Sequence, residues 1–398
     1  MPKNKRPVPR KSASAPEDNT EQMAQALADL ALDIAEREED DPAALREKEA
    51  ELARLVRNAL RKKNDEVLYG AIEQARFTDA GAFGYLRGKV EEAAATTTLR
   101  REGRPAEEID AFLVPVFVST TGGLKQEQTF QDVAAFELLR ASFQQAGLES
   151  ADATVVLISH AYDLDEIDRI SYSQLNDMLR EVAATMSEKK MVDTPVLSAS
   201  IAGWSGGGFA PEDEAMELRF LLGFVRRRAD DPFYAEPAGE AAAEAWYDAR
   251  MERYRQWTLD AAPLLQACLA ADPSSVSLNF LYQDLFYGAK EQGMAELAML
   301  GVMSEIGQAL EAHAVDPAEL SAIVAPAASG DELTLRINLY RGGEDGPMVS
   351  AEKGFDLAGD VEAELDELCE ALRAMGIQAV SVADKFDADG QAVGVRTA

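Results

Sequence analysis

The spacing of apolar residues changes near Thr96, and this change limits the folds open to the chain. From Thr20 to about Ala95, apolar side chains recur every three or four residues, which is the spacing of one face of an α-helix. Beyond Thr96 they form short continuous runs such as 112–118, which are typical of buried β-strands. The sequence therefore predicts an α+β or α/β chain in which a helical module at 19–95 precedes mixed-sheet layers.

Residues 96–235 combine strands with helices and are predicted to form an α/β domain. A hairpin turn is expected at Glu102-Gly103, before an apolar strand in which Pro115 indicates an edge or a bulge. Helices and further strands alternate after this strand, and that alternation favours a partly parallel sheet.

Residues 236–398 follow a different order of elements. A long helix comes first, then a strand at 276–282, a helix at 294–313, three strands, another helix and a last strand at 377–382. This order is close to the split β-α-β arrangement of ferredoxin-like folds. We therefore expect a ferredoxin-like α+β domain, a fold that supports many functions and identifies none of them.

Charge is distributed unevenly along the chain. The formal net charge is −32, yet the first twelve residues hold five Lys or Arg and no acid. Residues 1–18 are also rich in proline and serine, so we expect a disordered basic tail that is solvated, folded back on the acidic body or bound to an anionic partner. The acidic body disfavours direct contact with nucleic acid or anionic membranes and favours protein partners with basic surfaces.

Further features bear on location and cofactors. The two cysteines, Cys268 and Cys369, lie far apart in the sequence, which suits a reducing cytoplasm. We find no secretory signal and no run of about 18 apolar residues, so we expect neither export nor a membrane span. The glycine patterns that bind phosphates or dinucleotides are absent too, and the sequence predicts no cofactor.

A glycine-rich stretch carries the sharpest catalytic motif. Residues 203–207, GWSGG, match G-x-S-x-G after a predicted strand, as in hydrolases that expose a nucleophilic serine on a tight turn. Ser205 would be the nucleophile, and His313, later in the chain, the candidate base. However, a strand follows the motif where a helix is required, and His313 ends a helix. A flexible glycine loop is the competing interpretation.

A second candidate site follows the predicted strand at 154–159. His160 comes directly after it, with Asp163, Asp165, Glu166 and Asp168, where α/β proteins often place metal or phosphoryl chemistry. The metal ligands expected are His160, Asp163 and Asp165. An imidazole and two carboxylates are suitable ligands for a divalent metal ion. Asp165, Glu166 and Asp168 equally suit the first turn of a helix, where the macrodipole favours negative charge, so a structural helix start is the alternative.

Four aromatic residues lie on the long helix that begins near residue 239. Trp246 and Trp257 are eleven residues apart, about three helical turns, and so share a face. We expect them to pack on the sheet together with Tyr247 and Tyr254. The alternative is an interface anchor, since Trp and Tyr are enriched at interaction hot spots.

Four stretches allow a comparison at the family level. They are Arg54–Asn58 with the residues up to Asn64, Glu102–Pro105, Phe280–Tyr287 and Asp316–Val324. In these stretches the chain resembles a family of bacterial proteins of similar length that is known only as a conserved, uncharacterised family. The resemblance spans most of the chain after about residue 45, and it implies no activity, cofactor or site residue.

The scarcity of histidine decides which function the sequence favours. Only two histidines are present, so acid–base schemes that depend on histidine have few routes. We therefore expect a non-catalytic binding or interaction protein. The alternatives are a serine-dependent hydrolase using Ser205 and a divalent-metal-binding protein using Asp163 and Asp165.

Overall fold

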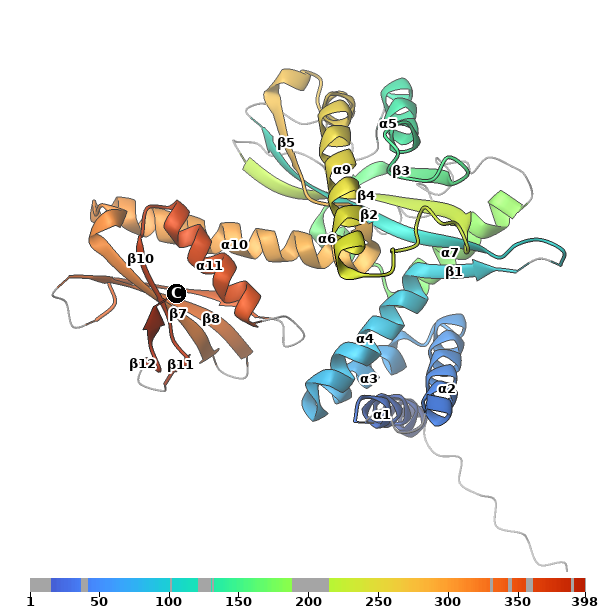
Figure 1. Ribbon diagram of the computed structural model, residues 1–398, viewed down its shortest axis with the longest axis horizontal. Helices are drawn as coiled ribbons and strands as arrows, with labels where there is room; N and C mark the ends of the chain where they lie inside the picture. Colours follow the sequence, from blue (N-terminus) through green and yellow to red (C-terminus); the bar gives the residue numbers. More distant parts are fainter. Residues whose placement is uncertain are drawn as a thin grey trace, which may run out of the picture. The chain divides into compact units, whose positions relative to one another are not determined.

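The computed structural model describes residues 16–36, 42–100, 102–120, 130, 132–187, 215–329, 332–342, 346–355, 361–387 and 390–397. The chain is a mixed α+β protein, with helices first and several sheets after them (Figure 1). Contacts divide it into two compact units, residues 1–97 with 170–181 and residues 98–169 with 182–398. None of the helices described has the length and apolar content that a membrane span needs.

The first unit is built from four consecutive helices and the beginning of a later one. They are α1 (Pro16–Ala35), α2 (Pro42–Arg61), α3 (Asp65–Thr78), α4 (Ala80–Ala95) and the part of α7 (Tyr172–Ser187) up to Glu181. The predicted apolar stripes form its core, where Leu27, Leu52, Leu68 and Leu86 are at most 3% exposed. Of the predicted basic tail, only 16–18 lie within the described residues, and they begin α1.

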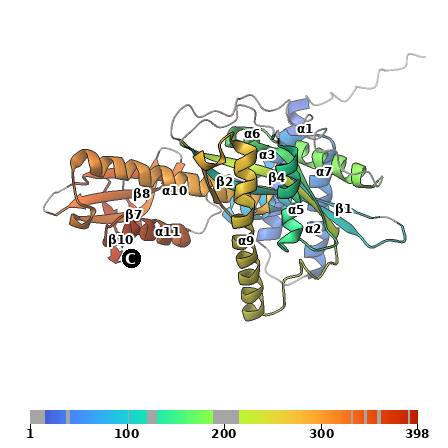
Figure 2. The same cartoon turned by 90° about the horizontal axis from the view of Figure 1, so that it is seen from above.

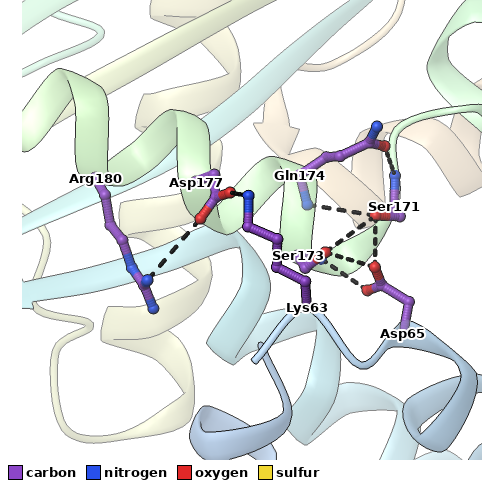
Figure 3. A network of polar contacts seen from close by, with 7 residues as sticks. All are labelled: Lys63, Asp65, Ser171, Ser173, Gln174, Asp177 and Arg180. Carbon is purple, nitrogen blue, oxygen red and sulfur yellow. Dashed lines mark hydrogen bonds and ion pairs between the residues drawn. The ribbon is translucent and has the colours of Figure 1, made fainter. Parts of the chain in front are cut away.

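A polar network ties the start of α7 to α3 (Figure 3). The Asp65 carboxylate accepts hydrogen bonds at 2.9 Å from the Ser171 hydroxyl and at 2.9 Å from the Ser173 N–H. Ser171 and Gln174 also form a reciprocal pair, in which the Ser171 N–H donates to the Gln174 side chain at 2.8 Å and the Gln174 N–H donates to the Ser171 hydroxyl at 3.3 Å. These bonds satisfy N–H groups that have no partner within the helix.

A second contact lies one turn further along α7. Asp177 pairs with Lys63 at 2.5 Å, and Arg180 approaches the same carboxylate at 3.9 Å (Figure 3). The Asn176 side-chain amide donates to the Ala93 carbonyl of α4 at 3.2 Å. Residues 171–180 are therefore an integral part of the helical unit, although about 75 residues separate them from α4 in sequence.

The second unit contains a six-stranded sheet centred on β2 (Glu107–Thr120). Its other strands are β1 (Thr96–Leu99), β3 (Thr154–Tyr162), β4 (Ala215–Arg228), β5 (Val276–Phe280) and β6 (Asp284–Leu285). The strand order is β1-β2-β4-β3, and β5 and β6 also pair with β2. Helices α5 (Val133–Gln145) and α9 (Glu240–Leu269) pack on one face of this sheet, around the fully buried Trp257 (Figure 1).

The prediction of a partly parallel sheet is wrong for β2 to β6, because each pair recorded among these strands is antiparallel. β2 and β3 do run in the same direction, and α5 lies between them in sequence, as the alternation indicated. However, β4 is inserted between them and pairs with both. A split β-α-β unit therefore occurs in this sheet.

Pro115 lies in a central strand and not at an edge or a bulge. Its carbonyl accepts a hydrogen bond from the Leu281 N–H at 2.9 Å, so its backbone polar groups face the side of β5 and β6. β5 pairs with residues 116–120 and β6 with 112–113, and the interval between these two strands falls opposite Pro115. The missing N–H of proline therefore costs no ladder hydrogen bond.

A second sheet follows in the order β13-β10-β7-β8-β9. Its strands are β7 (Leu320–Ser329), β8 (Glu332–Arg341), β9 (Val349–Gly354), β10 (Ala379–Val382) and β13 (Arg396–Thr397). β10 is parallel to β7, and the other pairs are antiparallel. Helices α10 (Phe286–His313) and α11 (Val361–Ala374) pack along this sheet (Figure 2). Strands β11 (Lys385–Phe386) and β12 (Ala392–Val393) form a separate hairpin.

The ferredoxin-like arrangement is not confirmed for the C-terminal part. The strand predicted to begin it, β5, pairs with β2 in the first sheet. The helix predicted at 294–313 begins earlier, at Phe286, and contributes to two cores. A Cβ at Gly293 would lie 3.1 Å from the Phe220 ring of the first sheet, whereas Ile306 is buried in the core of the second.

Gly223 of β4 offers a test of this packing. It lies opposite Phe112 of β2, and a Cβ at this position would overlap the Phe112 ring. Gly223→Ala should therefore destabilise the protein by about 1–3 kcal/mol through overpacking. Gly84→Ala is the matched control, because no atom outside the adjoining backbone of α4 lies within 4 Å of the added Cβ, and alanine there should stabilise by roughly 0.5–1 kcal/mol.

Urea unfolding followed by circular dichroism measures both variants. Equal unfolding midpoints for Gly223→Ala and the unmodified protein would contradict the close approach of Phe112 to this backbone.

Candidate functional site

The predicted metal site lies where β3 ends and the short helix α6 (Leu164–Asp168) begins. The pairing of β3 with β4 is irregular between Leu157 and Ala161, which lie opposite Gly223 and Leu221. Three residues of β3 thus correspond to one residue of β4, as in a β-bulge, a feature often found beside functional sites. His160 is the last of the three and is only 5% exposed.

A buried carboxyl group faces His160. The Nε2 atom of His160 lies 3.5 Å from Oε2 of Glu166, and Glu166 is itself 4% exposed. Asp163 and Glu166 form a capping box at the start of α6, in which the Glu166 N–H donates to Asp163 at 2.8 Å and the Asp163 N–H donates to Glu166 at 2.9 Å. The alternative interpretation, a structural helix start, therefore describes Asp165 and Glu166, which lie in the first turn of α6, and Asp163 caps that turn.

Arg219 of β4 joins this group from a distant part of the sequence. Its guanidinium lies 3.4 Å from the Asp163 carboxylate and also pairs with Glu217, while Arg219 itself is 6% exposed. The strand pairing of β3 with β4 brings these side chains together. The result is a buried cation held between two partly exposed carboxylates, an arrangement in which each charge compensates the desolvation of the other.

Two atoms of the buried pair have no hydrogen-bond partner among the residues described, Nε2 of His160 and Oε1 of Glu166. Buried polar groups in proteins are nearly always satisfied, so this pair departs from the usual pattern. Among the described side chains, the predicted metal site has no matching cluster of ligands. Within the described ranges, no three His, Cys, Asp or Glu side chains gather as ligands, and Asp165 is exposed.

The predicted hydrolase pair is only partly described. Ser205 and the rest of the glycine motif lie outside the described residues. His313 is the exposed last residue of α10, where its position suits the negative end of the helix dipole. No hydrogen bond or ion pair links its imidazole to another residue in the part of the chain that the structure describes. Catalysis by Ser205 with His313 remains a prediction.

The aromatic residues of α9 divide into two groups. Tyr254 and Trp257 are buried against the first sheet, as expected, and the Trp257 indole N–H donates to the Ser142 hydroxyl at 2.7 Å. Tyr247 is 51% exposed, so its predicted packing on the sheet is wrong. Trp246 packs beside Tyr247 and is not part of the core cluster. The first turns of α9, which carry Trp246 and Tyr247, extend beyond the core of the first sheet. The aromatic residues of this one helix therefore differ in burial.

Glu149 is a buried carboxyl that sequence reasoning did not identify. It is 4% exposed and accepts a hydrogen bond from the Tyr234 hydroxyl at 2.8 Å. Burial raises the pKa of Glu149 above its usual value, and the hydrogen bond from Tyr234 opposes this rise only in part. No local sequence signal marks this residue, because its burial arises from segments near 234 and 283 that pack over it.

Glu166 belonged to the cluster of acids named from the sequence, whereas Arg219 was not selected. The spacing of Asp163 and Glu166 was a readable signal, since an acid followed three residues later by Glu is typical of a capping box. Arg219 gave no such signal, because it reaches the site only through the pairing of β3 with β4.

Comparisons with known proteins do not assign the chain to a family. No family model, curated protein or solved structure matches it. The resemblance to an uncharacterised bacterial family therefore remains a prediction, and the interpretation of each site rests on its own geometry.

Substitutions of Asp163 and Asp165 separate a structural role from a metal site. Asp163→Ala removes the cap of α6 and the ion pair with Arg219, so we expect a loss of about 1 kcal/mol in unfolding free energy. Asp165→Ala alters an exposed carboxylate and should change stability by less than about 0.5 kcal/mol. Thermal unfolding with and without Mg²⁺, Mn²⁺ or Ca²⁺ is the measurement. Stabilisation by an ion that disappears in both variants would instead support the metal site.

The raised pKa of Glu149 makes a prediction about pH. A carboxyl with a raised pKa in the folded state favours the protonated form, so its contribution to stability is present below the unfolded pKa and is lost as pH rises through the folded pKa. Glu149→Gln keeps a hydrogen-bond acceptor for Tyr234 and removes this loss. The variant should therefore gain stability over the unmodified protein as pH rises from about 4 to about 7.

Urea unfolding at several pH values tests this, with Asp152→Asn, an exposed acid nearby, as the control. A constant difference in stability between Glu149→Gln and the unmodified protein at every pH would contradict the raised pKa.

Proposed function

We propose that this protein is a non-catalytic interaction protein that binds a partner protein with a basic surface. The observation that supports the proposal is the outer face of α11. This helix buries Leu365, Leu368 and Leu372 against the second sheet. Its exposed acids are Glu362, Asp366, Glu367 and Glu370.

The spacing of these acids concentrates their charge. Glu362, Asp366 and Glu370 follow at intervals of four residues and so lie above one another on the helix. Like charges at this spacing each destabilise a helix by roughly 0.2–0.5 kcal/mol. In the described part of the chain, Asp366, Glu367 and Glu370 form no ion pair with Lys or Arg. A cationic partner would relieve the repulsion between them.

The acidic face is carried on a firmly held helix. Lys353 of β9, 4% exposed, pairs at 2.5 Å with Glu364 of α11, which anchors the helix beside the sheet. The apolar side of α11 is part of the same core as α10. Because α11 is already ordered, little of the free energy of binding would be lost in ordering this surface when a partner binds.

The overall charge favours the same class of partner. A formal net charge of −32 attracts cationic surfaces from a distance and speeds their encounter, particularly at low ionic strength. Direct binding of nucleic acid is disfavoured by the same field.

A defined cationic probe tests the proposal. Fluorescein-labelled poly-L-lysine should bind the full chain in an anisotropy titration, and binding should weaken as salt rises. The triple variant Asp366→Asn, Glu367→Gln, Glu370→Gln should weaken binding about tenfold, because three exposed charge contacts are each worth about 0.5 kcal/mol.

The matched control is Glu296→Gln, Glu305→Gln, Glu311→Gln, which removes the same charge from exposed positions on α10. An equal loss in both triple variants would contradict a role for α11 and assign binding to the total charge alone. Absence of binding at low salt would contradict the proposed function.

A further inference from the structure

A groove with a cavity volume of about 430 Å³ lies between α2 and α4 of the helical unit. Its α2 wall contains Arg46, Ala50, Ala53 and Arg57, at successive spacings of four, three and four residues. This spacing places the four side chains on one face of the helix. Ala93 lines the opposite wall, and the small size of these alanines leaves the space between the helices open and makes part of its lining apolar.

The groove is lined by cations in a chain that is otherwise acidic. Arg46, Arg57 and Lys89 all border it, although the formal net charge of the chain is −32. Lys89 pairs with Glu92 at 2.8 Å. The guanidinium groups of Arg46 and Arg57 form no ion pair and no hydrogen bond within the described ranges, despite the large excess of acids. Two guanidinium groups are therefore available to a ligand.

Tyr85 adds a hydrogen-bond donor inside the groove. Its hydroxyl oxygen is buried and makes no hydrogen bond of normal geometry among the described residues, although the Glu49 carboxylate lies close enough to interact with it. Burial, and then the charge of the nearby Glu49, raises the pKa of this hydroxyl, so it keeps its proton at any ordinary pH. An acceptor atom on a ligand would give this donor a hydrogen bond of better geometry than the one that Glu49 offers.

We propose that the groove between α2 and α4 binds an organic anion, a molecule with an apolar body and a carboxylate or sulfonate group. The apolar body packs against Ala50, Ala53 and Ala93. The acidic group is bound by Arg46 or Arg57, since guanidinium groups make strong, paired hydrogen bonds to such oxyanions. This site is separate from the acidic face of α11 and does not depend on the function proposed for that face.

The dimensions and charges of the groove favour this class over two others. Its volume falls within the range of small-molecule sites, roughly 300–1,000 Å³, and far exceeds what an inorganic phosphate ion would fill. Polyanions such as nucleic acid are disfavoured, because Glu49 and Glu92 also line the groove and the whole chain is strongly acidic.

The fluorescent probe 8-anilinonaphthalene-1-sulfonate has the required chemistry, an aromatic body with one sulfonate. Titration into the full chain should give saturable binding. At least one of Arg46→Ala and Arg57→Ala should weaken it about tenfold, the effect of losing one charge-assisted hydrogen bond. Ala50→Phe, which fills the groove and keeps every charge, should also weaken it.

Two controls make the result specific. Arg54→Ala removes a cation from the same helix, but Arg54 is already paired with Glu51 at 2.6 Å and does not line the groove, so binding should be unchanged. N-phenyl-1-naphthylamine, the neutral analogue, should bind more weakly and without dependence on either arginine. Circular dichroism should show the same helix content in all variants, since Arg46, Ala50, Arg54 and Arg57 are exposed.

The proposal is overturned by any of three results. They are no binding of the sulfonate probe, binding that survives Arg46→Ala, Arg57→Ala and Ala50→Phe unchanged, or an equal loss in Arg54→Ala.

Discussion

Strand β2 imposes the constraint on which the larger unit depends. Its residues 109–118 are all buried, so both faces and both edges of the strand must be covered. β4 covers one edge, β5 and β6 cover the other, and α5, α9 and the first turns of α10 pack on the faces. Proline is tolerated at position 115 because neither β5 nor β6 pairs with β2 at that residue. Segments far apart in sequence are thus held together by one apolar strand.

The same burial determines where charge can be displayed. Helices α2, α4 and α11 direct their apolar faces into cores, which leaves their outer faces free to carry polar groups. On α11 that outer face is acidic, whereas α2 and α4 enclose a groove bordered by Arg46, Arg57 and Lys89. The acidic face favours a cationic partner, and the groove bordered by cations favours an anionic ligand. This complementarity of charge is the physical basis of the two binding proposals.

Local sequence patterns predicted the helices and strands better than they predicted which strands pair with one another. The helices at 20–95 and most of the later strands follow from apolar spacing, because that spacing reflects which face of each element is buried. The pairing of strands did not follow. β4 is inserted between β2 and β3, and β5 belongs to the first sheet, since pairing depends on long-range packing that no local window contains. The cap formed by Asp163 was readable locally, but its partner Arg219 was not.

By itself, the sequence determined the excess of acid, the amphipathic helices and the apolar strands, because charge and periodicity are properties of consecutive residues. Only the tertiary structure decided that Ser171 and Ser173 bind Asp65, that His160 faces Glu166, and that two alanine-lined helices leave a groove open. Each of these depends on how separate segments pack in space. A residue's burial and partners come from the whole fold, and no spacing within one segment contains that information.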